Sequence, residues 1–202
     1  MKFILFLKNN DYSYSKLSII RTLLSALLLF TISACNNQVS TSPSGDSTKT
    51  ESMSTDDAAI KKAVDDAYAW ISFKKGSKPD YEKIHDYFMP TAILGFFPND
   101  TLQVLSLEQF VTGYKNMIDQ GQIQSFYEEE MYGKTDQYGR IAQRLSSYKT
   151  YINTMDSVSE RGVNSFQLIK TPAGWKISSI IWDTEKKGMS IPDKYLPQKN
   201  NP

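Results

Sequence analysis

The chain has 202 residues, a formal net charge of +1, 12% aromatic residues, one cysteine and one histidine. This length fits one domain with accessory segments, and the aromatic content excludes a disordered or collagen-like chain. The balanced charge gives no indication of nucleic-acid binding. A single cysteine excludes an internal disulfide, and one cysteine with one histidine excludes an ordinary structural zinc site.

Residues 1–34 are organised like a bacterial secretory signal. A basic region precedes an apolar run over 23–32, which is too short to span a bilayer. The junction Ile32-Ser33-Ala34-Cys35 resembles a lipobox. This resemblance implies cleavage before Cys35, acylation of its thiol, and a lipid anchor in the bacterial cell envelope on the extracytoplasmic side. The alternative is an ordinary signal peptide in which Cys35 is incidental.

The segment 35–54 begins with Cys35 and contains no aromatic and almost no aliphatic residues. It cannot bury enough surface to order itself, so we predict a flexible tether with an end-to-end distance of about 24 Å. Loss of residues 1–34 changes the basic and acidic counts from 23 and 22 to 19 and 21. The mature chain is therefore expected to be mildly acidic.

A domain is predicted over 55–187, and its first half contains three helices. The first begins at an N-cap near Ser54 and ends at Gly76. The second begins at Pro79 and is stopped by Pro90. The third begins at Ser106, in a pattern typical of a capping box, and ends near Gly121. Apolar residues at helical spacing give each helix one buried face.

The hydrophobic period changes from helical to alternating after Gly121. Short connections predict antiparallel pairing, and helices that precede long strands indicate an α+β fold with the helices on one face of the sheet. Residues 188–202 contain three prolines and are predicted to form a loose tail. The predicted strands span 92–97, 102–105, 126–132, 140–153, 162–170 and 175–184.

The order of these elements resembles the nuclear transport factor 2-like superfamily, including its SnoaL-like members. The similarity spans about 57–185 and is densest in 138–143, 161–168 and 174–182. It implies a cone in which three N-terminal helices pack on a strongly curved antiparallel sheet around a pocket. Members often pair through the open sheet face, so a homodimer is also implied. The superfamily includes isomerases, dehydratases, hydrolases, cyclases, ligand carriers and structural modules, so the fold does not specify a function.

Three consecutive glutamates lie on the strand over 126–132. Glu128 and Glu130 share one face of that strand, and Glu129 takes the other. At least one glutamate is therefore expected to point toward the helices. A carboxylate in an apolar cone would have a raised pKa and could serve as an acid or base, paired with Arg144. The alternative is a solvated edge with a cross-strand ion pair.

His85, followed by Asp86, is a second candidate for acid–base chemistry. The alternative is a half-buried histidine at the edge of a helix, since neighbouring helical residues do not face each other. His85 and Asp86 therefore form no obvious catalytic pair.

Polar and aromatic residues on the later strands are candidates for ligand binding. Asn164 and Gln167 lie on opposite faces, so at most one enters the cone. The last strand alternates with Trp175, Ile177 and Ile181 on its core face, so Trp182 on the other face indicates a β-bulge, a pocket wall or a subunit interface. The ligand-binding candidates are Tyr148, Asn164, Gln167 and Trp182.

The sequence contains no nucleophile elbow, phosphate-binding loop, dinucleotide fingerprint or metal-ligand cluster, so no cofactor or metal is predicted. Aromatic residues are not interleaved with basic ones, which argues against nucleic acid as a partner. The first hypothesis is non-catalytic binding of a small hydrophobic ligand, or protein interaction. The alternative is a cofactor-free lyase, isomerase or hydrolase that acts on a small hydrophobic substrate through a pocket carboxylate or His85. A third hypothesis is a dimerising structural module.

Overall fold

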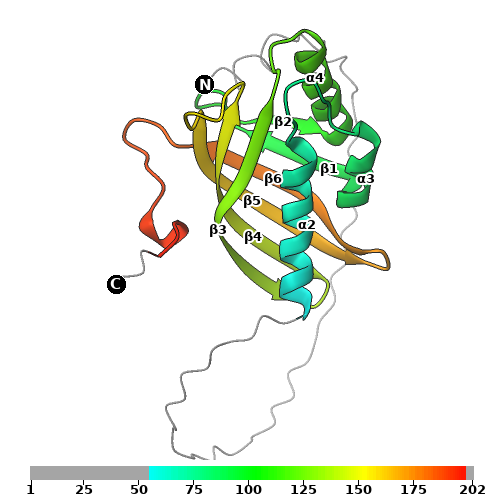
Figure 1. Ribbon diagram of the computed structural model, residues 1–202. Coiled ribbons are helices and arrows are strands. Elements are labelled where there is room, and N and C mark those ends of the chain that lie inside the picture. The colour runs from blue at the N-terminus through cyan, green and yellow to red at the C-terminus, as the bar shows by residue number, and fades with distance from the viewer. Residues whose placement is uncertain (1–54, 199–202) are drawn as a thin grey trace, which may run out of the picture. The chain divides into compact units, whose positions relative to one another are not determined.

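The computed structural model describes residues 55–198, so the predicted signal peptide, the tether and Cys35 lie outside the described residues. The described chain has the α+β architecture predicted from the sequence (Figure 1). Its elements are α2 (Thr55–Ile71), η1 (Tyr81–Lys83), α3 (Ile84–Tyr87), β1 (Phe88–Phe96), β2 (Gln103–Ser106), α4 (Leu107–Asp119), β3 (Phe126–Tyr138), β4 (Ile141–Ile152), β5 (Glu160–Thr171), β6 (Gly174–Thr184) and η2 (Asp193–Tyr195).

The six strands form one curved sheet in the order β2-β1-β6-β5-β4-β3, and α2 lies across its concave face (Figure 1). Most neighbours pair antiparallel, as predicted, but β1 and β6 pair parallel. The prediction of a wholly antiparallel sheet was therefore wrong at this one junction. Short links determine the direction only of strands that follow each other in the chain, and β1 and β6 are far apart in sequence.

The first helix ends earlier than the sequence predicts. α2 stops at Ile71, because the backbone of Phe73 pairs with that of Phe126 through two hydrogen bonds of 2.7 and 3.0 Å. This pairing joins the end of α2 to the start of β3, the strand that carries the three glutamates. The predicted capping box is confirmed: Gln109 N–H donates to Ser106 Oγ over 3.2 Å, and Ser106 N–H donates to Gln109 Oε1 over 2.9 Å.

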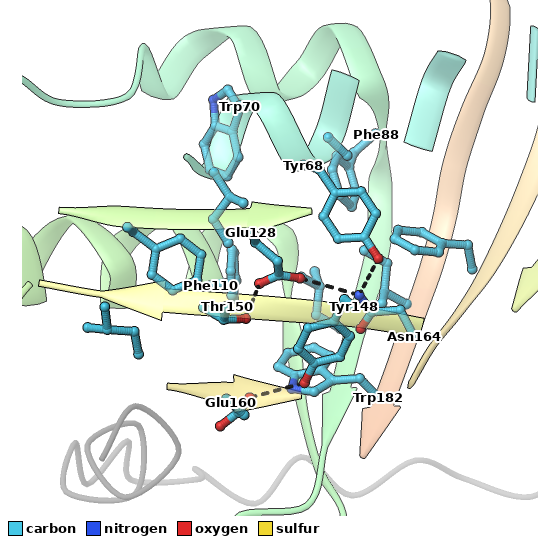
Figure 2. A pocket seen from close by; sticks show the side chains of 17 residues that line it. Tyr68, Trp70, Phe88, Phe110, Glu128, Tyr148, Thr150, Glu160, Asn164 and Trp182 are labelled. Atoms are coloured by element: carbon cyan, nitrogen blue, oxygen red, sulfur yellow. Dashed lines mark hydrogen bonds between the residues drawn. The ribbon is translucent and has the colours of Figure 1, made fainter. Parts of the chain in front are cut away.

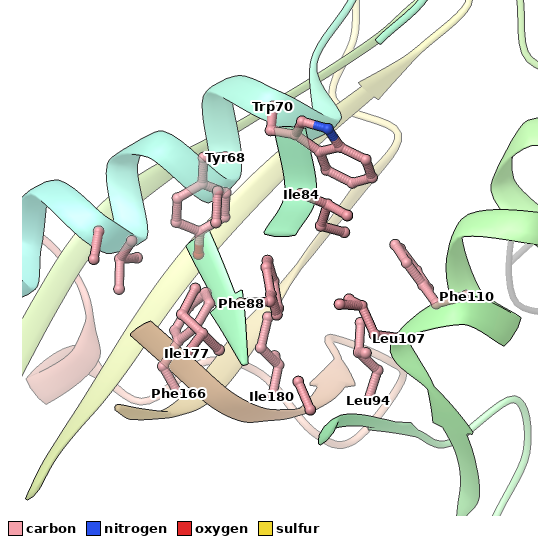
Figure 3. Packing of buried hydrophobic residues seen from close by; sticks show 14 of the residues in the cluster. Tyr68, Trp70, Ile84, Phe88, Leu94, Leu107, Phe110, Phe166, Ile177 and Ile180 are labelled. Carbon is pink, nitrogen blue, oxygen red and sulfur yellow. The ribbon is translucent and has the colours of Figure 1, made fainter. Parts of the chain in front are cut away.

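The core lies between the concave face of the sheet and the three helices (Figure 3). Tyr68 of α2 meets Phe166 of β5 edge-on, with ring centroids 5.8 Å apart, while Ile84 of α3 and Ile177 of β6 are fully buried. Complete burial of an isoleucine side chain stabilises a fold by about 1.5–3 kcal/mol. Packing of this kind holds α2 at a fixed distance from the sheet.

A β-bulge interrupts the last strand, which was one of the three explanations for the position of Trp182. Gln167 pairs with Ser179, whereas Leu168 pairs with Ile177, so one extra residue lies between them on β6. The bulge reverses the inward and outward positions beyond it. Ile180 is therefore buried and Ile181 is 42% exposed, so the assignment of Ile181 to the core face was wrong.

The segment after Lys187 does not have the loose character expected of it, at least as far as residue 198. It includes η2, and Ile191 is 8% exposed, with its backbone N–H donating to Glu185 Oε1 over 3.1 Å. Within residues 55–198, none of the helices combines the length and the apolar character that crossing a bilayer requires.

Candidate functional site

A pocket lies between α2 and the concave face of the sheet (Figure 2). Its wall is mostly aromatic and aliphatic, with a few polar side chains from β3, β4 and β5. The residues that line it are Ala67, Tyr68, Trp70, Ile71, Phe88, Leu94, Phe110, Phe126, Glu128, Tyr148, Thr150, Ile152, Glu160, Asn164, Phe166, Ile180 and Trp182.

The pocket is partly open to solvent and leaves a cavity of about 70 Å³. Without movement of the walls, that space holds a few water molecules or a small molecule. A narrow, largely apolar cavity with a few convergent polar groups is the usual form of a small-molecule site.

Glu128 is the most perturbed acid of the pocket. The Asn164 amide donates to its Oε1 over 3.4 Å, and the Thr150 hydroxyl donates to its Oε2 over 3.3 Å. Burial in this apolar wall, and then the nearby Glu160 carboxyl, raise the pKa of Glu128 to about 8. The two long hydrogen bonds act in the opposite direction without offsetting burial. Glu128 is therefore mostly protonated at neutral pH.

A second carboxyl, that of Glu160, lies in the pocket wall at the start of β5. The Tyr148 hydroxyl donates to its Oε1 over 3.0 Å (Figure 2). Burial raises the pKa of Glu160, and it raises the pKa of the Tyr148 hydroxyl well above its ordinary value. Tyr148 is therefore a neutral hydrogen-bond donor throughout the physiological range.

Three polar groups connect the pocket to the sheet behind it. The Tyr68 hydroxyl lies 2.8 Å from Ser146 Oγ and accepts a hydrogen bond from the Asn164 amide over 2.9 Å. Burial raises the pKa of Tyr68 well above its ordinary value, so its hydroxyl stays protonated. Asn164 thus contacts both Tyr68 and Glu128 from one position on β5 (Figure 2).

Glu130, two residues from Glu128 on the same inner face of β3, is fully engaged with its neighbours. Arg144 donates through Nε to Glu130 Oε2 over 2.8 Å and through Nη2 to Oε1, and Ser146 Oγ donates to Oε2 over 2.7 Å. Arg144 also donates through Nη1 to the Thr135 hydroxyl over 2.7 Å. The side chains of Arg144 and Glu130 are only 7% and 9% exposed.

The prediction that Glu128 and Glu130 share one face is confirmed: both point inward, and Glu129 faces outward, where it pairs with Lys149 over 2.8 Å. Of the two inward glutamates, Glu130 and not Glu128 is the one that pairs with Arg144. A bulge between Glu130 and Tyr132 in the pairing with β4 places these two residues on opposite faces.

The other predicted residues divide between the pocket and the outside. Tyr148, Asn164 and Trp182 line the pocket, and Trp182 stacks on Phe96 with ring centroids 5.0 Å apart. Gln167 is exposed and does not line the pocket. This agrees with the prediction that Asn164 and Gln167 lie on opposite faces of their strand, so that at most one of them enters the cone. His85 is also outside: its side chain is 43% exposed, and its Nε2 lies 3.6 Å from Glu108 Oε1.

The sequence reasoning did not single out Tyr68, Thr150 or Glu160 as site residues. Tyr68 lies at helical spacing on the apolar face of α2, where only its hydroxyl distinguishes it from the residues around it. Glu160 was assigned to a loop, because β5 was expected to begin at Gly162 rather than at Glu160. Within residues 55–198, no cluster of three or more histidine, cysteine or acidic side chains is arranged to hold a metal ion.

No family model and no curated protein matches the sequence. Solved structures do match. A nuclear transport factor 2-like superfamily protein from Salmonella enterica is 13% identical, with a TM-score of 0.51 over 64% of this chain and 90% of that chain. A protein of unknown function with a cystatin-like fold from Nostoc punctiforme is also 13% identical, with a TM-score of 0.53 over 66% of this chain and 93% of that chain.

A candidate scytalone dehydratase from Novosphingobium aromaticivorans is 11% identical, with a TM-score of 0.51 over 64% of this chain and 83% of that chain. Likenesses at this level of identity establish a shared fold and nothing about activity. The domain described by residues 55–198 has the nuclear transport factor 2-like fold.

Proposed function

We propose that the domain binds a small, mostly apolar molecule in the Glu128 pocket and exchanges a proton with it through Glu128. One observation carries this proposal: a buried carboxyl with a pKa of about 8 faces a cavity walled by aromatic rings. An acid whose pKa lies near the working pH is suited to proton transfer, and strongly perturbed groups concentrate at functional sites.

The proton transfer follows from the groups around Glu128. Protonated Glu128 donates its proton to a carbonyl or hydroxyl oxygen of the ligand and becomes a carboxylate. The Asn164 amide and the Thr150 hydroxyl then stabilise that carboxylate through the hydrogen bonds they already donate. The Glu128 carboxylate then takes a proton from a carbon atom of the ligand, which regenerates protonated Glu128. A protonated ketone thereby becomes its enol, the intermediate of an isomerisation, whereas a protonated hydroxyl leaves as water and a C=C bond forms. Because only protons move, this chemistry needs no cofactor. The candidate scytalone dehydratase supports no more than the compatibility of this fold with such a reaction.

Binding without turnover is the second candidate, and a specific observation favours it. Three other ionisable side chains could complete an acid–base pair, and each has another role or position: Glu130 is held by Arg144, His85 is exposed, and Glu160 already accepts a hydrogen bond from the Tyr148 hydroxyl. In that case Glu128 contributes only a hydrogen bond that orients the ligand.

Two measurements separate these functions. Ligand-observed NMR with a panel of single-ring phenols and ketones tests binding to the full chain at pH 6 and pH 9.5. We expect binding at pH 6, weaker binding at pH 9.5, and loss of this pH dependence in Glu128→Gln. Glu129→Gln is the matched control, because it removes a neighbouring carboxylate from the outer face.

Turnover is tested in D₂O with the ketones that bind. Deuterium incorporation at the carbon beside the carbonyl, lost in Glu128→Gln and kept in Glu129→Gln, supports proton transfer. Binding without incorporation supports the second candidate. If no member of the panel binds at either pH, and no small molecule copurifies with the full chain from its native host, the pocket is not a ligand site.

The lipid anchor is a further proposal, which rests on the sequence around Cys35. Such an anchor would hold the domain outside the cytoplasm, on a membrane of the bacterial cell envelope. A cell fed an alkyne-tagged fatty acid should label the full chain, and Cys35→Ser should abolish that label. Labelling that persists in Cys35→Ser contradicts the anchor.

Homodimerisation is likewise a proposal. An apolar patch on the outer face of the sheet supports it: Ile93, Leu102, Val104 and Ile181 are each 42–46% exposed. In sedimentation of the full chain in detergent, Ile181→Asp should convert a dimer to a monomer. A monomeric parent chain contradicts this proposal.

A further inference from the structure

The buried ion pair and the pocket acid are joined by a continuous line of hydrogen bonds. It runs from Glu130 to Ser146 over 2.7 Å, to Tyr68 over 2.8 Å, to Asn164 over 2.9 Å, and from Asn164 to Glu128 over 3.4 Å. Four elements contribute: β3 supplies both carboxyls, β4 the serine, α2 the tyrosine and β5 the asparagine. The residues come from distant parts of the chain, so the line exists only in the folded domain.

The direction of each donor in this line follows from Glu130. Arg144 donates to both carboxylate oxygens of Glu130, so Glu130 is the acceptor in its contact with Ser146 as well. The single hydroxyl proton of Ser146 is therefore used toward Glu130. Ser146 then has only lone pairs for Tyr68, so the Tyr68 hydroxyl is the donor in their 2.8 Å contact.

The same reasoning determines the orientation of the Asn164 amide. The one proton of Tyr68 points to Ser146, which leaves the Tyr68 oxygen as an acceptor for Asn164 Nδ2. With its amide reversed, Asn164 would place Oδ1 against that oxygen, with no proton between them. Asn164 Nδ2 therefore faces Tyr68, and its second N–H reaches Glu128 Oε1.

We infer that Tyr68 and Ser146 are positioning residues, which hold the Asn164 amide with an N–H directed at Glu128. The Arg144–Glu130 pair is the anchor of this arrangement. The inference rests on the proposed role of Glu128. None of these four side chains needs to touch a ligand, because their effect on the pocket passes through Asn164.

The arrangement has a consequence for Glu128 that a purely structural role would not have. A donated N–H stabilises the carboxylate form, and loss of one hydrogen bond of about 1 kcal/mol corresponds to somewhat less than one pKa unit. Loss of the Tyr68 hydroxyl frees the Asn164 amide to turn, so the pKa of Glu128 should rise.

The test is a carboxyl ¹³C NMR titration of the full chain, labelled at glutamate, with no ligand present. The Glu128 signal is assigned by its disappearance in Glu128→Gln. We expect Tyr68→Phe to raise the pKa of Glu128 by about half a unit to one unit. Asn164→Ala should raise it by a similar amount, and Tyr68→Phe should add nothing in the Asn164→Ala background.

Ser146→Ala is the second variant, which decides the matter if Tyr68→Phe does not fold, and it should raise the pKa in the same direction. Ser147→Ala is the matched control, because Ser147 is equally buried but donates to the Tyr132 carbonyl instead. Any of three results overturns the inference. The first is an unchanged pKa of Glu128 in Tyr68→Phe or Ser146→Ala, and the second is a shift of equal size in Ser147→Ala. The third is a full Tyr68→Phe shift in the Asn164→Ala background. This titration involves neither ligand nor turnover, so its result is independent of whether the proposed function holds.

Discussion

Glu128 and Glu130 are two residues apart on one face of β3, and the domain treats them in opposite ways. Glu130 meets a bidentate guanidinium and a serine hydroxyl. Glu128 receives two long hydrogen bonds from neutral groups and faces an apolar cavity. Burial of a charge is expensive unless it is paired and hydrogen-bonded, so these two environments imply different protonation states.

The difference separates a structural site from a functional one. Glu130 is buried together with Arg144, and the hydrogen bonds within this ion pair occupy the groups that could otherwise bind a ligand. Glu128 is protonated near neutral pH, and its ionisation at higher pH destabilises the fold because the carboxylate is buried. A group that costs stability in this way is typically retained for activity. Sequence spacing alone makes the two glutamates equivalent; the side chains opposite them make them different.

The largest expected effect comes from breaking the Glu130 side of this comparison. Arg144→Met leaves the Glu130 carboxylate buried with Ser146 as its only remaining partner among the contacts described above. We expect a loss of about 3–5 kcal/mol in the free energy of unfolding, measured by urea denaturation. Arg144→Met combined with Glu130→Leu should recover most of this loss, because no uncompensated charge remains. A single variant that costs less than about 1 kcal/mol would contradict the structural role of the pair.

Removal of the Glu128 charge should stabilise the fold, in contrast to removal of Arg144, and the size of this effect should depend on pH. The pKa of Glu128 is raised from 4.5 to about 8 by folding, so the folded state binds one more proton than the unfolded state between these values. The contribution of Glu128 to stability is therefore greatest below pH 4.5 and decreases as the pH rises toward 8. At pH 7 this linkage costs about 3 kcal/mol.

Glu128→Gln removes that cost. We expect this variant to be more stable than the parent chain by up to about 3 kcal/mol at pH 7, and to differ little near pH 4. Urea denaturation at the two pH values measures this difference. Glu129→Gln should show no comparable pH-dependent gain. A Glu128→Gln chain that is destabilised at pH 7 would mean that Glu128 is structural, like Glu130.

A smaller effect is expected where β5 closes the pocket wall. A Cβ atom at Gly162 would lie 2.7 Å from the Tyr148 hydroxyl and would also overlap the backbone carbonyl of Asp183. Because backbone cannot move aside cheaply, Gly162→Ala should cost about 1–3 kcal/mol and displace Tyr148 from Glu160. Gly95→Ala is the control: a Cβ there would lie 3.3 Å from side-chain carbons of Ile181 and Leu102 and 3.7 Å from the Gln103 carbonyl oxygen, so this variant should cost less. Equal costs in urea denaturation would contradict this account.

Much of the architecture could be predicted from local patterns. The capping box at Ser106 and the shared face of Glu128 and Glu130 both follow from spacing along a single element, and the same spacing gave a bulge as one of three explanations for Trp182. Local patterns did not predict the parallel pairing of β1 with β6, because no short link joins those strands. They also placed the end of the first helix at Gly76, since the backbone pairing of Phe73 with Phe126 is a long-range contact.

The candidate site was only partly predictable for the same reason. Arg144 lies opposite Thr135 in the β3–β4 register, yet its guanidinium reaches back to Glu130 across Gly133. A Cβ atom at Gly133 would overlap that guanidinium, so the absence of a side chain makes the pairing sterically feasible. Such a contact depends on register, on the bulge after Glu130 and on one glycine together, none of which a pattern of alternating residues contains.

Glu129, which lies between the two inward glutamates in the sequence, should give the smallest effect and serves as the control for the comparison. Glu129 pairs with Lys149 on the outer face, where the two side chains are 39% and 32% exposed. Water screens such a pair, so Glu129→Gln should change the free energy of unfolding by less than about 1 kcal/mol, and by less still in high salt. Urea denaturation at low and high salt measures this change. If Glu129→Gln matched Glu128→Gln in its pH-dependent gain, the gain would come from the net charge of β3 and not from the pocket. If the stability of Glu129→Gln relative to the parent chain does not change with pH, the gain in Glu128→Gln comes from burial, which is the property that distinguishes Glu128 from its neighbour.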